Sequence, residues 1–136
     1  MHPVGLPDLF LDRSLGRRQV PERLRARGLR LITLAEQYGI PADEDVEDVE
    51  WLELVGTRGW AALLKDTEIR RRPSEKQALI DHGVRAFCLS GGNLTAEEMS
   101  ERHLRALSAM TQACIDDDGP FIFAVHADRI VRLDLM

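Results

Sequence analysis

Short apolar runs alternate with helical patterns along nearly the whole chain, and this alternation restricts the fold more than any other feature of the sequence. Runs such as "LFLD" and "WAALLKD" are bounded by turn residues and have the length of buried strands. The expected strands cover residues 8–12, 29–34, 60–66, 84–90, 121–126 and 129–135. Because strands that alternate with helices form parallel sheets covered on both faces, the sequence predicts an α/β fold with a mostly parallel central sheet. The last two runs, joined by "ADR", predict an antiparallel C-terminal β-hairpin.

The segments between these runs carry helix signals. The pattern "RRQVPERLRARG" has a proline suited to a first turn and a glycine suited to a helix end, and "PSEKQALIDHG" repeats this arrangement. Acidic residues crowd the start of the helix expected before residue 59, which places Asp48 at or near its first turn. Thr95 and Glu98 form a capping-box pattern ahead of the longest expected helix, residues 96–115.

Length and composition point to one globular domain over residues 1–136. No apolar run approaches the roughly eighteen residues of a membrane span, and the start "MHPVGLPDLF" lacks the pattern of a secretory signal, so we expect a cytoplasmic protein with no membrane partner. Cys88 and Cys114 lie far apart without metal-binding spacing, and we expect both to be reduced and buried.

Charge is unevenly distributed along the sequence. Sixteen of the eighteen basic residues are arginine, and eleven of these arginines precede residue 73, whereas the segment 43–53 carries seven acids. Solvated helix faces explain part of this pattern. The net charge of −5 excludes nothing, because a nucleic-acid site needs local rather than overall positive charge.

Two aspartates end two of the expected strands. Asp12 and Asp66 should lie at the carboxyl edge of the sheet, where function gathers in open parallel sheets, and Asp48 should enter the same rim. Any one of them alone is more simply a cap or turn residue. Three converging carboxylates, however, repel one another unless a proton or cation lies between them. Hard oxygen ligands of this kind suit Mg²⁺ or Mn²⁺ acting on a phosphodiester.

Basic residues adjoin two of these aspartates. Lys65 precedes Asp66, the run Arg70, Arg71 and Arg72 follows it, and Arg13 follows Asp12. Arginine binds phosphate oxygens through a fork of donors without reading sequence. We therefore expect these five residues to contact the backbone of a polyanionic substrate.

The stretches "LFLDRSLGRRQVPERLRARG", "DVEWL" and "GWAALLKDTEIRRRP" resemble the three acidic motifs of PIN-like domains, in particular the VapC-type toxin ribonucleases of bacterial toxin–antitoxin pairs. The resemblance covers roughly the first eighty residues. It implies a PIN-like three-layer fold and a Mg²⁺- or Mn²⁺-dependent endoribonuclease whose metal-binding acids are Asp12, Asp48 and Asp66. It also implies a cognate antitoxin. We expect the chain to form either a homodimer or a hetero-oligomer with this antitoxin. Glu36, in "TLAEQYG", is the candidate for a fourth catalytic acid, the alternative being a solvated loop residue.

Two other readings remain open. A phosphoacceptor receiver domain shares the alternating pattern and the strand-end aspartate, but that family has an acidic pair where this chain has Asp12 alone, and a lysine that "FIFAVHADR" lacks. A non-catalytic PIN-like interaction module would keep the acidic rim without cleavage. The run from Asp116 to Asp118 is more typical of a solvated turn, and the four histidines do not form a site.

Overall fold

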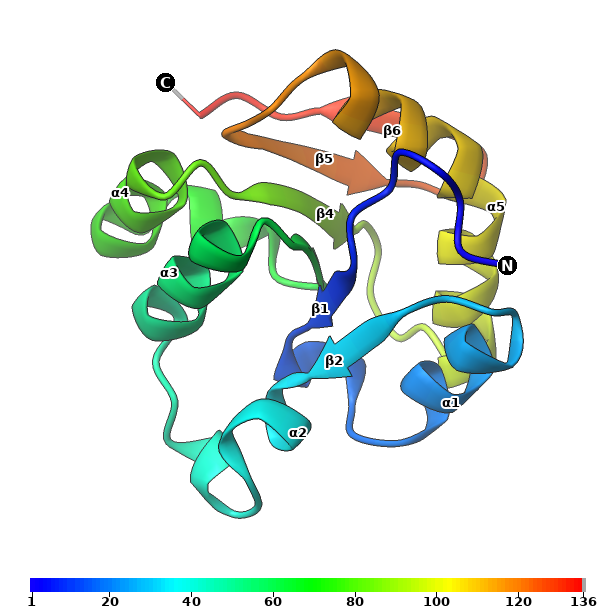
Figure 1. The fold of residues 1–136 in the computed structure, drawn as a ribbon, viewed down its shortest axis with the longest axis horizontal. Helices are drawn as coiled ribbons and strands as arrows, with labels where there is room; N and C mark the ends of the chain where they lie inside the picture. Colours follow the sequence, from blue (N-terminus) through cyan, green and yellow to red (C-terminus); the bar gives the residue numbers. More distant parts are fainter. Residues whose placement is uncertain (136) are drawn as a thin grey trace.

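The computed structural model describes residues 1–135 and contains one six-stranded sheet with strand order β2-β1-β3-β4-β5-β6 (Figure 1). The strands are β1 (Leu9–Leu11), β2 (Leu31–Thr33), β3 (Ala61–Leu64), β4 (Arg85–Leu89), β5 (Phe121–Val125) and β6 (Ile130–Arg132). The α-helices are α1 (Gln19–Ala26), α2 (Leu34–Tyr38), α3 (Asp48–Arg58), α4 (Pro73–Asp81) and α5 (Ala96–Asp116). Three 3₁₀ turns are η1 (Arg13–Leu15), η2 (Ala42–Glu44) and η3 (Thr67–Arg70).

The first five strands are parallel, and β5 and β6 form an antiparallel hairpin. All six strands lie within the predicted segments, so the mostly parallel sheet and its C-terminal hairpin are confirmed. β1 lies between β2 and β3, with Leu11 opposite both Thr33 and Leu63. The carboxyl ends of β1 and β3 therefore reach the same edge of the sheet.

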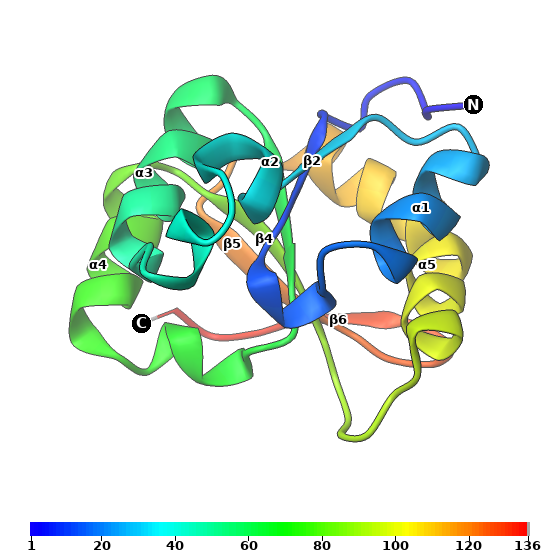
Figure 2. The same cartoon turned by 90° about the horizontal axis from the view of Figure 1, so that it is seen from below.

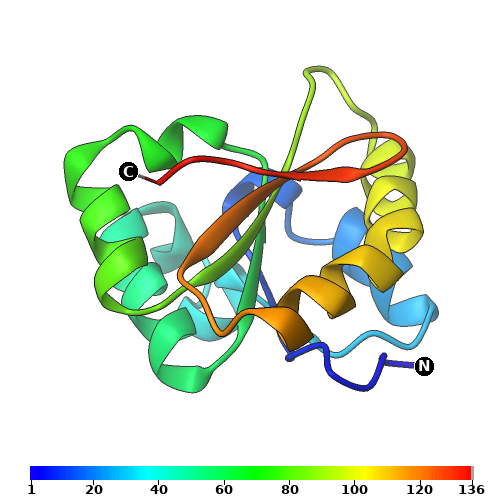
Figure 3. The same ribbon diagram turned by 90° about the horizontal axis from the view of Figure 1, so that it is seen from above.

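Helices cover both faces of the sheet and give the three layers that were expected. Figures 2 and 3 show α1 and α5 on one face and α3 and α4 on the other. Side chains of β1 alternate between the two faces: Leu9 and Leu11 belong to the α1/α5 core, whereas Phe10 belongs to the α3/α4 core. Since every residue of β1 and β3 is buried, both strands read as unbroken apolar runs in the sequence.

The helix boundaries follow the local signals. Thr95 and Glu98 form the predicted capping box of α5, and Pro73 occupies the first turn of α4. The aromatic ring of Phe10 stacks with Trp51 and with Trp60, at centroid separations of 5.6 and 6.0 Å, and the contact with Trp51 packs α3 against the sheet. Within residues 1–135, no helix has the length and apolar character to cross a membrane.

Candidate functional site

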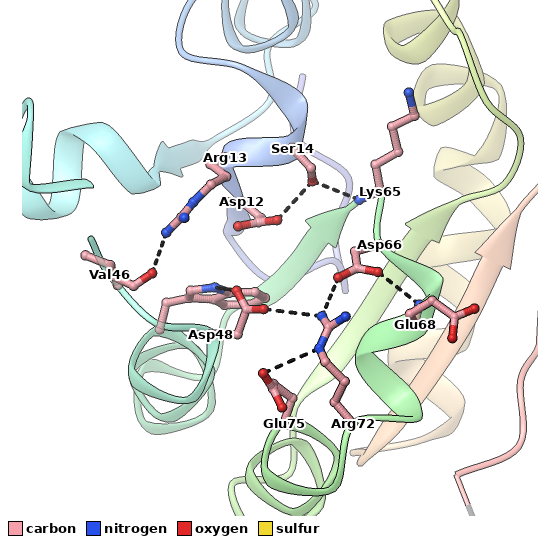
Figure 4. A network of polar contacts seen from close by, with 11 residues as sticks. Asp12, Arg13, Ser14, Val46, Asp48, Lys65, Asp66, Glu68, Arg72 and Glu75 are labelled. Atoms are coloured by element: carbon pink, nitrogen blue, oxygen red, sulfur yellow. Dashed lines mark hydrogen bonds and ion pairs between the residues drawn. The ribbon is translucent and has the colours of Figure 1, made fainter. Parts of the chain in front are cut away.

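The three predicted aspartates come together at the carboxyl edge of the sheet. Asp12 follows β1, Asp66 follows β3 after one intervening residue, and Asp48 is the first residue of α3. The Asp12 N–H donates to the Leu63 carbonyl at 3.1 Å, so the ladder between β1 and β3 extends up to the site. Figure 4 shows the three carboxylates around a common space.

Asp12 is the most deeply buried of the three, with 6% of its surface exposed. The Ser14 hydroxyl donates to Oδ2 at 2.9 Å, and the Lys65 backbone N–H donates to the Ser14 Oγ at 3.0 Å, which links the ends of β1 and β3. The other oxygen, Oδ1, is buried without a hydrogen-bond partner. Burial raises the pKa of Asp12, and the nearby charge of Asp48 adds to this effect. A buried acceptor without a partner is costly and points toward an absent ligand.

Asp48 is oriented by the α3/α4 core. The indole N–H of Trp51 donates to Asp48 Oδ1 at 2.8 Å. Because Trp51 is fully buried and stacks on Phe10, this donor has little freedom to move. The position of Asp48 in the first turn of α3 also places its negative charge at the favourable end of the helix dipole.

Asp66 is held by its own turn and by an arginine. Its Oδ1 accepts from the Glu68 N–H at 3.0 Å, which caps η3, and its Oδ2 accepts from Arg72 Nη2. The same Arg72 nitrogen lies 3.5 Å from Asp48 Oδ2, and Arg72 Nε lies 3.4 Å from Glu75 Oε1. The hydrogen bond to Asp66 is the main reason why the pKa of Arg72 is raised. One guanidinium group therefore joins three carboxylates (Figure 4).

Glu36 has a different set of partners from the three aspartates. It lies in α2, a short helix that the sequence analysis did not predict, and it forms a capping box with Thr33. Its Oε1 accepts from the Thr33 N–H at 2.9 Å and from Arg25 Nη2 at 2.7 Å. Arg25 is also the main cause of the lowered pKa of Glu36. The T-x-x-E signal of α2 was present in the sequence and is the same signal that identified α5.

The five basic residues expected to contact RNA do not form one exposed patch. Arg13 donates to the backbone carbonyls of Val46 and Glu44, the latter at 3.3 Å. Arg70 donates to the Asp134 carbonyl at 3.3 Å, close to the C-terminal end of the chain. Arg72 points into the acidic site rather than outward.

The remaining two basic residues are directed differently. The side chain of Lys65 extends away from the aspartates (Figure 4). Arg71 has 63% of its side chain exposed and only a 3.9 Å contact with Glu68. These two residues are the best placed of the five for contact with a polyanion.

Arg17 was not among the predicted site residues but supports the site. Its Nε and Nη2 donate to the two carboxylate oxygens of Asp43 at 3.0 and 2.8 Å. This pair of hydrogen bonds is the main cause of the lowered pKa of Asp43. Together with the bonds from Arg13, it fixes the acidic segment that leads into Asp48. The only sequence signal was the separation of an arginine-rich segment from an acidic one.

The residues of the site fit a divalent cation in their chemistry, although their present arrangement differs from a formed metal site. Within the described chain, no three His, Cys, Asp or Glu side chains are grouped closely enough to hold a metal ion. The ligands on offer are hard carboxylate oxygens, as Mg²⁺ and Mn²⁺ prefer. Asp12 Oδ1 lacks a partner, and the cationic head of Arg72 lies between Asp48 and Asp66. Both observations indicate that this rim accommodates a cation.

Known proteins are similar to this chain over most of its length. A family model described as a PIN like domain matches residues 7–91, which include all three aspartates. Over 130 residues the chain is 39% identical to "Putative ribonuclease VapC45" of Mycobacterium tuberculosis (strain ATCC 25618 / H37Rv), a match that covers 96% of this chain and 94% of that protein. No solved structure matches the chain significantly. The family match over most of the chain and the nearly end-to-end similarity to a VapC protein show that the chain belongs to the PIN-like domain family, as a VapC-type member.

Proposed function

We propose that the chain, as one PIN-like domain, is a metal-dependent endoribonuclease and the toxin of a type II toxin–antitoxin pair. The observation that carries this proposal is the convergence of Asp12, Asp48 and Asp66, from three separate elements, around a buried carboxylate oxygen without a partner. The similarity to a protein named as a ribonuclease supports RNA as the substrate. A cytoplasmic location is consistent with this role.

The metal ligands we propose are Asp12, Asp48 and Asp66, and the ion is Mg²⁺ or Mn²⁺. A bound divalent ion lowers the pKa of water and neutralises charge that develops on a phosphodiester in the transition state. Glu36 is left out of this ligand set because it bonds to Arg25 and Thr33, which are different partners from those of the three aspartates.

The chain itself contributes the orientation of the carboxylates. Ser14 fixes one oxygen of Asp12 and leaves the other available, while Trp51 fixes one oxygen of Asp48. Because Ser14 belongs to η1 and Trp51 to the buried core, these donors restrict the orientation of Asp12 and Asp48 before a ligand binds. Lys65, whose side chain extends away from the aspartates, and Arg71, which is 63% exposed, would contact the RNA backbone near Asp66.

The partner we propose is a cognate antitoxin that covers the acidic rim. A basic side chain of the antitoxin could pair with the aspartates as Arg72 does in this structure. Such a contact would block access of both metal and RNA. Co-expression with the product of a neighbouring small gene should then suppress cleavage, and an antitoxin that bound without changing cleavage would contradict this part of the proposal.

The test of the nuclease activity is cleavage of RNA by the purified protein with Mn²⁺, Mg²⁺ or EDTA. Asp66→Asn should abolish cleavage at every salt concentration while RNA binding is retained, because the lost interaction belongs to the chemical step. Asp8→Asn is a matched control, since Asp8 precedes β1 at the opposite edge of the sheet and pairs with Arg30 at 2.7 Å. Cleavage by Asp66→Asn at the parental rate, or cleavage unaffected by EDTA, would refute the proposed function.

A further inference from the structure

Arg72 occupies an unusual place for a basic residue next to a proposed metal site. Its guanidinium lies inside the acidic rim, with Nη2 bonded to Asp66 and 3.5 Å from Asp48, and with Nε 3.4 Å from Glu75 (Figure 4). A positive group in this position neutralises the same carboxylates that a divalent ion would need. The two cations therefore compete for Asp48 and Asp66.

The backbone holds Arg72 in place while its side chain remains able to move. Arg72 is the N-cap residue of α4 and precedes Pro73, so the path of the chain is fixed between η3 and α4. The side chain is 41% exposed and is not confined by core packing. Rotation of the long side chain, rather than a backbone change, is sufficient to remove the guanidinium from the aspartates.

Glu75 provides a second position for the same guanidinium. It lies in the first turn of α4, where its side chain is 22% exposed, and it contacts Nε rather than the nitrogen that meets the aspartates. Glu75 also borders the surface groove that contains Arg13 and Asp48. A guanidinium that leaves Asp48 and Asp66 can therefore keep one carboxylate partner at the rim of the site.

From this geometry we infer that Arg72 is an internal counter-cation of the acidic site, which pairs with Asp48 and Asp66 in the metal-free protein and must be displaced toward Glu75 before a divalent ion binds. The inference rests on the proposed function, because it takes the aspartates as metal ligands. Arg72 protects the free protein from repulsion among its acids, and in doing so it lowers the affinity for metal. Metal loading is then a competition within the chain as well as a binding event.

The test compares Arg72→Gln with Arg71→Gln, which removes the adjacent, more exposed arginine and serves as a matched control. Mn²⁺ binding is measured by calorimetric titration without RNA, and thermal melting is measured in EDTA and in Mn²⁺. Even with the screening of bulk water, a unit charge about 5 Å from a divalent ion is enough for roughly a tenfold change in affinity. Arg72→Gln should therefore bind Mn²⁺ about tenfold or more tightly, should melt at a lower temperature in EDTA, and should gain more stability from Mn²⁺ than the parent does. Arg71→Gln should resemble the parent in all three measurements.

A second variant, Arg72→Lys, covers the case in which the glutamine variant does not fold in EDTA. Lysine retains the charge but lacks the fork that joins Asp66 and Glu75, so it should give a smaller gain in the same direction. Unchanged or weaker Mn²⁺ binding by these folded variants, with a parent that binds Mn²⁺, would overturn the role of Arg72 and leave the proposed function intact. Failure of both the parent and the variants to bind Mn²⁺ would overturn the proposed function together with this inference.

Discussion

Replacement of Asp12 by asparagine should stabilise the metal-free protein. Asp12 is almost fully buried, one of its oxygens has no hydrogen-bond partner, and the charge of Asp48 acts against its ionised form. Asparagine keeps the size of the side chain and an oxygen that can accept from Ser14, but it removes the buried charge. The amide nitrogen of asparagine would lie where Oδ1 now lies and would lack a hydrogen-bond partner there, which offsets part of this gain.

The size of the effect follows from these terms. An unpaired buried polar group costs about 1 to 3 kcal/mol and a charged one more, so exchange of the charged group for the neutral one should add about 1 to 2 kcal/mol to the free energy of unfolding. For a chain of this length that corresponds to a rise in Tm of about 3 to 7 °C. Because the pKa of Asp12 is raised by folding, its ionisation destabilises the folded state above the unfolded pKa near 4. The advantage of Asp12→Asn should therefore be largest at neutral pH and should shrink toward about pH 4.

Urea denaturation in EDTA at several pH values, followed by circular dichroism, measures this difference. Asp8→Asn again serves as the control: it alters an exposed ion pair at the other end of β1 and should change stability by less than about 1 kcal/mol. Addition of Mn²⁺ should stabilise the parent but not Asp12→Asn, which reverses their order. If Asp12→Asn is less stable than the parent in EDTA at neutral pH, the account of Asp12 as an unsatisfied buried ligand is refuted.

Three further changes test other parts of the structure. His103 is fully buried, and burial lowers its pKa to about 4, so between this value and pH 6.5 the unfolded chain binds more protons than the folded one. The free energy of unfolding should therefore fall by about 3 kcal/mol as the pH decreases across that range, and His103→Leu should flatten this dependence in urea titrations. Trp51→Phe should lose the bond to Asp48 and leave a small cavity in the core, so the free energy of unfolding should fall by about 2 to 3 kcal/mol. Mn²⁺ binding, measured by calorimetry, should become several-fold weaker, and unaltered binding would show that this bond does not orient the carboxylate. Joint replacement of Lys65 and Arg71 by alanine should weaken RNA binding and reduce the slope of log affinity against log salt concentration by roughly one unit for each lost phosphate contact. An unaltered slope would exclude these residues from the RNA interface.

The sheet and the three aspartates could be predicted because their signals are local. Each parallel strand is buried on both faces and reads as an apolar run, and a residue directly after such a run lies at a known edge of the sheet. Asp12 and Asp66 satisfy this rule. Asp48 was predicted to lie at or near the first turn of a helix with an acidic start, and it is the first residue of α3. The residue types then suggested a divalent metal and a phosphodiester, and the family resemblance added RNA cleavage, which spacing alone could not supply.

The partners of these aspartates could not be predicted, because they depend on the directions in which side chains point, and sequence spacing does not fix these directions. The indole of Trp51 and the hydroxyl of Ser14 act within one turn of their acceptors, yet either could have faced elsewhere. Arg72 follows Asp66 by six residues, but its orientation toward Asp48 depends on the way that α3 and α4 pack. The short helix around Glu36 was missed because a five-residue helix carries too little periodicity to stand out against the preceding strand.

The separation of charge along the sequence has an internal explanation in the fold. Arg17 binds Asp43 of the acidic segment, Arg25 binds Glu36 and Arg72 binds Asp66, so three of the arginines that precede residue 73 are already paired with carboxylates. An arginine already paired with a carboxylate contributes little to the attraction of a polyanion, since the field of the pair largely cancels at a distance. The number of arginines in the first half of the chain therefore overstates its capacity for RNA. Lys65, which extends away from the aspartates, and Arg71, which is 63% exposed, lie near the acidic site without such a strong pairing. Their replacement should therefore weaken RNA binding more than replacement of the paired arginines.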